Sequence, residues 1–157
     1  MITLQFVLAD DIASRLIAWY GQGSGGFSHV DAVLPDGRLL GARSDRVGGR
    51  PPGVQIRPPD YEKWSRVCRV NIPVGASKAQ EWLAWLTSQV GTPYDMGSIW
   101  GFLWGQNDHE RGRWICSALQ TAALEHIGIL PVLPVEPSEV TPNALRLIAV
   151  AIGGRVT

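Results

Sequence analysis

The chain has 157 residues, 18% charged and 45% hydrophobic, a size that fits one globular domain and leaves little room for a second. Fourteen basic residues balance fourteen acidic ones, so no net charge draws the whole molecule to nucleic acid or to an anionic membrane. No apolar stretch reaches the ~20 residues that cross a hydrocarbon core. We therefore expect one soluble domain over residues 1–157, with no nucleic-acid partner and no stable membrane insertion.

The first ten residues contain no basic leader and no small-residue cleavage site, so we expect no signal peptide. Cys68 and Cys116 can form at most one bridge, and we expect both thiols to be reduced. No two histidines or cysteines have the spacing that is typical of a zinc site. The sequence therefore predicts neither a metal nor a cofactor, and it does not indicate the oligomeric state.

The first half of the chain consists mainly of short β-rich segments. Residues 10–20 have the pattern of a short capped helix, and the Gly-rich run after it is typical of a flexible connector. The Pro35-Asp36-Gly37 turn predicts a β-hairpin, which a loop over about 44–53 follows. Five segments have the composition and alternation of strands: residues 2–8, 27–34, 38–43, 54–57 and 67–72.

Helical periodicity replaces this alternation after Ser77, which we expect to cap a helix that Gly91 ends. Further helices are predicted over about 95–104, from Cys116 to Gly128, and over about 142–148 with Pro142 in the first turn. Strands followed by helices indicate an α+β fold, an antiparallel sheet with the helices packed on one side.

Cys116 is the residue best placed for chemistry, because it lies in the first turn of a predicted helix. Unpaired N–H groups and the positive helix end stabilise a thiolate there. A free cysteine is also an ordinary small apolar side chain, so position alone leaves both interpretations open. Cys68 lies within a strand pattern, and we expect it to be structural.

A nucleophilic thiol needs a base, and the histidines differ in their ability to supply one. His126 lies ten residues along the same helix, about 15 Å from Cys116. His109 lies in a polar loop. His29 lies in a strand whose alternation places it on one face with Asp31, and an acid there can fix the tautomer and orientation of the imidazole.

Several segments, in chain order, resemble the circularly permuted branch of the NlpC-type papain-like cysteine hydrolases. They are Phe27-Ser28-His29-Val30, Gly91-Thr92-Pro93-Tyr94-Asp95, Trp114-Ile115-Cys116-Ser117 and Val140-Thr141-Pro142-Asn143-Ala144-Leu145. In that branch the histidine strand precedes the cysteine helix, and the resemblance covers about residues 2–148. It implies a permuted papain-like architecture.

The resemblance also implies the roles of the site residues. Cys116 would be the nucleophile and His29 the base, while Tyr94 and the backbone N–H of Cys116 would donate to the oxyanion. The implied protein is a cysteine peptidase or amidase that works through an acyl-enzyme, on cell-wall peptides by family analogy. A cytoplasmic or phage-associated location is the matching expectation.

The sequence departs from the family pattern at the third polar residue. The family usually has a polar side chain near the position of Gly41 and a glycine where this chain has Asp31. With a three-residue hairpin loop Asp31 faces Gly41, whereas with a two-residue turn Ser44 faces His29. Gln55 on the next strand is a third candidate. We predict that Asp31 orients the base.

Other functions remain open from the sequence. The departure at Gly41 favours a non-catalytic binding or assembly module on the same scaffold, and related scaffolds also carry out lipid acyl transfer or thioester hydrolysis. Residues 38–69 hold eight basic residues against three acidic ones, which fits an anion-binding surface. The expected partner is a small peptide, amide or acyl substrate.

Overall fold

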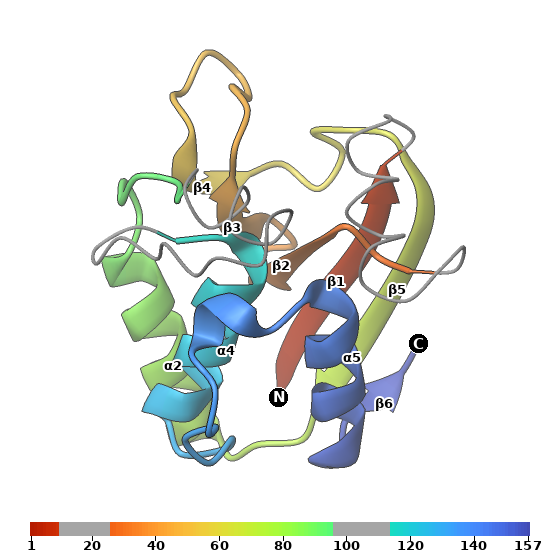
Figure 1. Ribbon diagram of the computed structural model, residues 1–157, viewed down its shortest axis with the longest axis vertical. Coiled ribbons are helices and arrows are strands. Elements are labelled where there is room, and N and C mark those ends of the chain that lie inside the picture. The colour runs from red at the N-terminus through yellow and green to blue at the C-terminus, as the bar shows by residue number, and fades with distance from the viewer. Residues whose placement is uncertain (10–25, 96–113) are drawn as a thin grey trace.

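The computed structural model describes residues 1–9, 26–95 and 114–157 (Figure 1). Three predictions fall outside these residues, wholly or in large part. They are the helix over 10–20, the Gly-rich connector after it, and the helix over about 95–104. The loop that contains His109 also lies outside these residues.

The described strands form one six-stranded antiparallel sheet in the order β4-β3-β2-β1-β5-β6 (Figure 1). Five of them confirm predicted strands, although the fifth begins at Trp64 instead of Val67. The two-residue strand β6 was not predicted, because it is too short to show an alternation. The strands are β1 (Ile2–Ala9), β2 (His29–Val33), β3 (Leu39–Arg43), β4 (Gly53–Arg57), β5 (Trp64–Ile72) and β6 (Arg155–Val156).

Three α-helices in the described residues lie together on one side of this sheet, which makes the molecule α+β (Figure 1). They are α2 (Ala76–Ser88), α4 (Cys116–His126) and α5 (Pro142–Ala151), with the short 3₁₀ helix η1 (Pro137–Glu139) before the last. None of the helices in the described ranges has the length and apolar character needed to cross a membrane.

The helix ends correct two predictions and confirm two. Ser77 does not cap α2, since Gly75 precedes the first turn without a side-chain cap bond. The helix ends at Ser88, with Gln89 as its C-cap, and therefore stops before Gly91. Ala76 is a strong helix former, so α2 begins there, directly after the extended backbone of Gly75. Gly128, with φ of 66°, terminates α4, and Pro142 lies in the first turn of α5.

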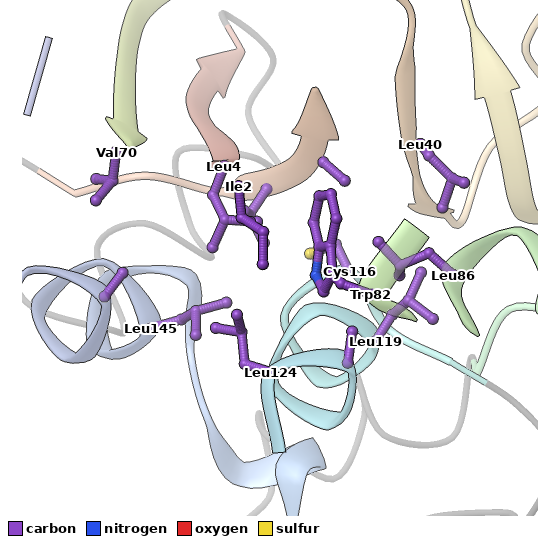
Figure 2. Close-up of a cluster of buried hydrophobic side chains, with 14 of the residues drawn as sticks. Ile2, Leu4, Leu40, Val70, Trp82, Leu86, Cys116, Leu119, Leu124 and Leu145 are labelled. Carbon is purple, nitrogen blue, oxygen red and sulfur yellow. The ribbon is translucent and has the colours of Figure 1, made fainter. Parts of the chain in front are cut away.

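Apolar side chains from the inner face of the sheet and from the helices form the core (Figure 2). Ile2 and Leu4 of β1 meet Leu119 and Leu124 of α4 there, all of them fully buried. Cys116 belongs to this same cluster, at the beginning of α4. The core therefore fixes the end of the helix that carries the thiol.

The β2–β3 hairpin has the three-residue loop that places Asp31 opposite Gly41. Ala32 pairs with Leu40, and the Leu34 N–H donates to the Arg38 carbonyl over 2.8 Å. Gly37 in the loop has φ of 84°, a conformation that glycine adopts at little cost. The two-residue turn that would place Ser44 against His29 is thus excluded.

Candidate active site

Cys116 is the first residue of α4, as the sequence predicts. Ile115 before it is extended and provides no side-chain cap. The approach to the helix is fixed by Trp114, which donates to the Pro93 carbonyl and accepts from the Asp95 N–H, both over 3.1 Å. The Cys116 side chain is 7% exposed. The thiol therefore sits at the positive end of a helix whose position is set by two independent chain segments.

His29 opens β2, and its ring reaches both the thiol and Asp31. The Nε2 atom lies 2.9 Å from Oδ1 of Asp31, and the ring makes a side-chain hydrogen bond with Cys116. Asn143 of α5 holds the entry to this strand, because its Oδ1 accepts from the Phe27 N–H over 2.8 Å.

The sulfur of Cys116 also contacts the backbone of β2, one residue after His29. Leu34 directs its N–H toward β3, and alternate residues of a strand point their backbone groups the same way. The register of β2 with β3 covers Ala32 and Val33, and the backbone of Val30, beyond it, makes a hydrogen bond to Cys116. This hydrogen bond favours the thiolate.

Asp31 is 1% exposed and accepts hydrogen bonds on both oxygens. Nη2 of Arg57 lies 2.9 Å from Oδ1, and the Tyr61 hydroxyl donates to Oδ2 over 2.9 Å. A Cβ on Gly41 would lie 2.0 Å from Oδ1 of Asp31. Glycine at position 41 is therefore what makes room for the carboxylate.

Neighbouring charges outweigh the desolvation of these groups. Burial favours neutral imidazole, yet the charges of Asp31 and Cys116 raise the pKa of His29 from 6.5 to about 9. Burial likewise opposes ionisation of the two acids, but His29 and Arg57 hold the pKa of Asp31 well below 3.8, and His29 lowers the pKa of Cys116 below 9.0. The site therefore favours a thiolate beside an imidazolium.

Tyr94 is a neighbour of this pair. It forms a parallel bridge with Trp114, two residues before the thiol. Burial, and next to it the charge of Cys116, raises the pKa of Tyr94 well above 10, so its hydroxyl keeps the proton and can donate it in a hydrogen bond. The predicted position of Tyr94 near the sulfur agrees with this.

Of the three candidates for the third polar residue, Asp31 is the one in contact with His29. Ser44 is exposed, and the amide of Gln55 donates to the Pro51 carbonyl. The structure thus brings Cys116, His29 and Asp31 together and leaves the other two candidates aside.

Sequence reasoning missed three residues around the acid. Trp64 stacks on His29 with ring centroids 6.4 Å apart, and Tyr61 meets Trp64 edge-on. The strand alternation of residues 54–57 places Arg57 on the face of Gln55, which is a signal that could have found it. Tyr61 lies between β4 and β5, where no periodicity shows the direction of a side chain.

Some of the eight basic side chains in residues 38–69 form ion pairs with acidic residues. Arg43 binds Asp45 and Glu62, and Arg57 binds Asp31. No group of three or more histidines, cysteines, aspartates or glutamates in the described ranges has the arrangement of a metal site. No known family model and no curated protein matches this sequence.

Proposed function

We propose that this chain is a thiol-dependent hydrolase of peptide or amide bonds that works through an acyl-enzyme on Cys116. One observation carries the proposal: the sulfur, the imidazole and a buried carboxylate form one chain of contacts, with the sulfur at a helix N-terminus. This is the arrangement that an activated cysteine nucleophile requires. The resemblance to permuted papain-like hydrolases supports the same conclusion and the same architecture.

In the proposed reaction the Cys116 thiolate attacks the substrate carbonyl carbon. The backbone N–H of Cys116 and the Tyr94 hydroxyl donate to the oxyanion that develops. Imidazolium of His29 then gives its proton to the leaving nitrogen as the carbon–nitrogen bond breaks. Water attacks the thioester while His29 takes its proton, and expulsion of the thiolate releases the acid.

Gly41 occupies the position where the family usually has the third polar residue, and we propose that Asp31 takes that role instead. Its carboxylate occupies the space that a side chain at position 41 would enter, 2.9 Å from the His29 ring nitrogen. The acid comes from the same strand as the base instead of from its neighbour. Because the contact to the base is what orients it, the origin of the carboxylate does not matter.

The proposed substrate class is a cell-wall peptide, by family resemblance. The same steps would also cleave an ester or a thioester, or pass the acyl group to another acceptor, and the fold does not decide among them. A panel of peptide amides, acyl esters and acyl thioesters separates a peptidase from a thioesterase or a lipid acyltransferase. We expect the amides to be cleaved, with release abolished by Cys116→Ala.

Alkylation of the two cysteines by iodoacetamide at mildly acidic pH tests the nucleophile directly. Cys68 is the more exposed of the two, so exposure alone predicts that it reacts first. We expect Cys116 to react at least about tenfold faster, because a tenfold larger thiolate fraction corresponds to one unit of pKa.

The matched controls for this experiment are two histidine variants. His29→Ala should abolish the difference between the cysteines, whereas His126→Ala should leave it unchanged, because that side chain stacks on Trp85 away from the sulfur. Equal, slow reaction of both cysteines in the wild-type chain would refute the hydrolase and favour a binding module.

A further inference from the structure

Asp31, the third residue of the proposed triad, is a charged side chain that is buried, so another group must stabilise its charge. Asp31 is 1% exposed, and the neighbouring His29 and Cys116 are 9% and 7% exposed. An ion pair of thiolate and imidazolium is neutral, so adding the carboxylate leaves one uncompensated negative charge. A buried, uncompensated charge is strongly unfavourable, and such a group usually takes up a proton instead.

Arg57 is a buried cation in direct contact with this carboxylate. Its side chain is 2% exposed, and Nη2 lies 2.9 Å from Oδ1 of Asp31 and 3.2 Å from the Gly41 carbonyl oxygen. The guanidinium lies over the Tyr61 ring, 4.7 Å from its centroid. Within the described ranges its Nε and Nη1 atoms find no acceptor, so the contact with Asp31 is its principal polar link.

Tyr61 holds the other side of the carboxylate. Its hydroxyl donates to Oδ2 over 2.9 Å, and its ring packs on Arg57 and against Trp64. Both oxygens of Asp31 are thus fixed, Oδ1 between Arg57 and His29 and Oδ2 by Tyr61. A carboxylate held at both oxygens cannot rotate away from the base.

Among the residues that the structure describes, other charged groups around this cluster have partners of their own. Arg43 of β3 binds Asp45 and Glu62 and reaches the Tyr61 hydroxyl over 3.4 Å. From β1, Gln5 pairs with Asp31 and accepts from Arg69 of β5 over 2.9 Å. In the described residues, the charges that act on Tyr94 are those of Cys116, Arg43, Asp95 and Asp45. In the described part of the chain, the cations within hydrogen-bond distance of Asp31 are His29 and Arg57.

We propose that Arg57 and Tyr61 are positioning residues, with Arg57 supplying the counter-charge that lets the Asp31 carboxylate and the thiolate–imidazolium pair coexist in a closed site. This inference rests on the proposed function. Thiolate, imidazolium, carboxylate and guanidinium together are neutral. Loss of Arg57 leaves a net negative cluster, which takes up a proton on the sulfur or on Asp31, and either event weakens the ion pair.

The test follows the rate of iodoacetamide labelling of Cys116 against pH, a readout that needs no substrate. Arg57→Gln should move the acid side of this profile upward by at least about one pH unit, so that labelling at the wild-type midpoint is at least about fivefold slower. Arg57→Lys keeps the charge and should remain near wild type. Tyr61→Phe removes one hydrogen bond and should shift the profile by less.

Two further variants separate charge balance from a structural effect. The double variant Asp31→Asn with Arg57→Gln is neutral again, so its profile should move back from that of Arg57→Gln toward the wild type. Arg38→Gln changes the net charge equally but lies in the exposed hairpin loop, where it pairs with Asp36, and should leave the profile in place.

An unmoved profile in Arg57→Gln and in Tyr61→Phe, with Cys116 still reactive, would overturn this inference and leave the proposed function standing. A wild-type Cys116 that is no faster than Cys68 would defeat the proposed function and this inference with it. If Arg57→Gln fails to fold, Tyr61→Phe decides: a shifted profile supports the inference and an unshifted one overturns it.

Discussion

At the scale of single residues, the site depends on Asp31 and Gly41 facing each other across the hairpin. The carboxylate of Asp31 fills the position that a Cβ at residue 41 would need, 2.0 Å from its Oδ1. With the Asp31 carboxylate in this place, residue 41 has room for no side chain larger than that of glycine. We therefore expect that a carboxylate at either position would enter the same space beside His29.

An exchange of these two residues tests that equivalence. Asp31→Gly should lower the turnover of a cleaved substrate by at least about tenfold, the lower range for a group that assists acid–base catalysis, while Cys116 can still be labelled. Adding Gly41→Asp to this variant should restore part of the turnover, because the new carboxylate enters the vacated space.

The control for the exchange is Gly41→Asp in the wild-type chain, where the two carboxylates would overlap. We expect this single variant to be less stable by about 1–3 kcal/mol, the usual cost of overpacking, as measured by urea unfolding. A double variant as inactive as Asp31→Gly alone would show that the acid must come from the strand of the base.

The sequence predicted Cys116, His29 and Asp31 because each stands in a periodic segment, where the pattern determines the direction of the side chain. The choice between Asp31 and Ser44 depended on the length of one hairpin loop, and the structure has the three-residue loop. Gln55, the third candidate, donates instead to the Pro51 carbonyl. Arg57 and Tyr61 bind the acid through contacts between strands that are distant in sequence. No local pattern encodes such contacts.

At the scale of elements, α4 and α5 together place the Cys116 sulfur and the His29 ring. The first turn of α4 presents the sulfur, and Asn143 in the first turn of α5 holds the backbone of Phe27, two residues before His29. The start of α5 is itself fixed by Thr141, whose hydroxyl accepts from the Ala144 N–H over 3.1 Å. Helix starts therefore control the geometry of the site.

The Thr141 cap can be tested by comparison with Ser77, which the sequence predicts as a cap but which lies inside α2. Thr141→Ala should lower the free energy of unfolding by about 1 kcal/mol, the usual value for a lost N-cap. Ser77→Ala should change it by less than about 0.5 kcal/mol, because Ser77 is an exposed residue inside α2. Urea unfolding of both variants measures this, and equal losses would contradict the assignment of the caps.

Most elements were predictable because alternation and helical spacing persist for five residues or more. The position of the α2 cap was not, since a serine near a helix start is a cap only if the preceding backbone is extended, and here the helix already begins at Ala76. Strand β6 has two residues and owes its existence to pairing with Val70 and Asn71. Such tertiary pairing leaves no mark on the local sequence.

At the scale of the whole molecule, the four charged groups of the site link its stability to pH. The pKa of Asp31 lies well below 3.8 in the folded chain. A carboxyl whose pKa is lowered by folding contributes stability that is present above its unfolded pKa and is lost as the pH falls toward its folded pKa. Acid should therefore weaken the wild-type fold more than the fold of a chain without this group.

Comparison of the wild-type chain with Asp31→Asn measures this linkage. The wild-type chain should be the more stable at pH 6, where the carboxylate balances Arg57. Below about pH 3.8 the difference in unfolding free energy should shrink by about 1.4 kcal/mol for each pH unit. Urea unfolding at several pH values gives the difference directly, and a constant difference down to pH 3 would contradict a charged Asp31.

The stacking of Trp64 on His29 gives the site an optical reporter of its own. The two rings are nearly parallel, at 13°, so a proton gained or lost by the imidazole changes the electric field at the indole. The fluorescence of Trp64 should consequently titrate with His29. Acylation of the nearby sulfur removes the thiolate that helps to keep the ring protonated, so turnover itself would modulate the emission of this tryptophan.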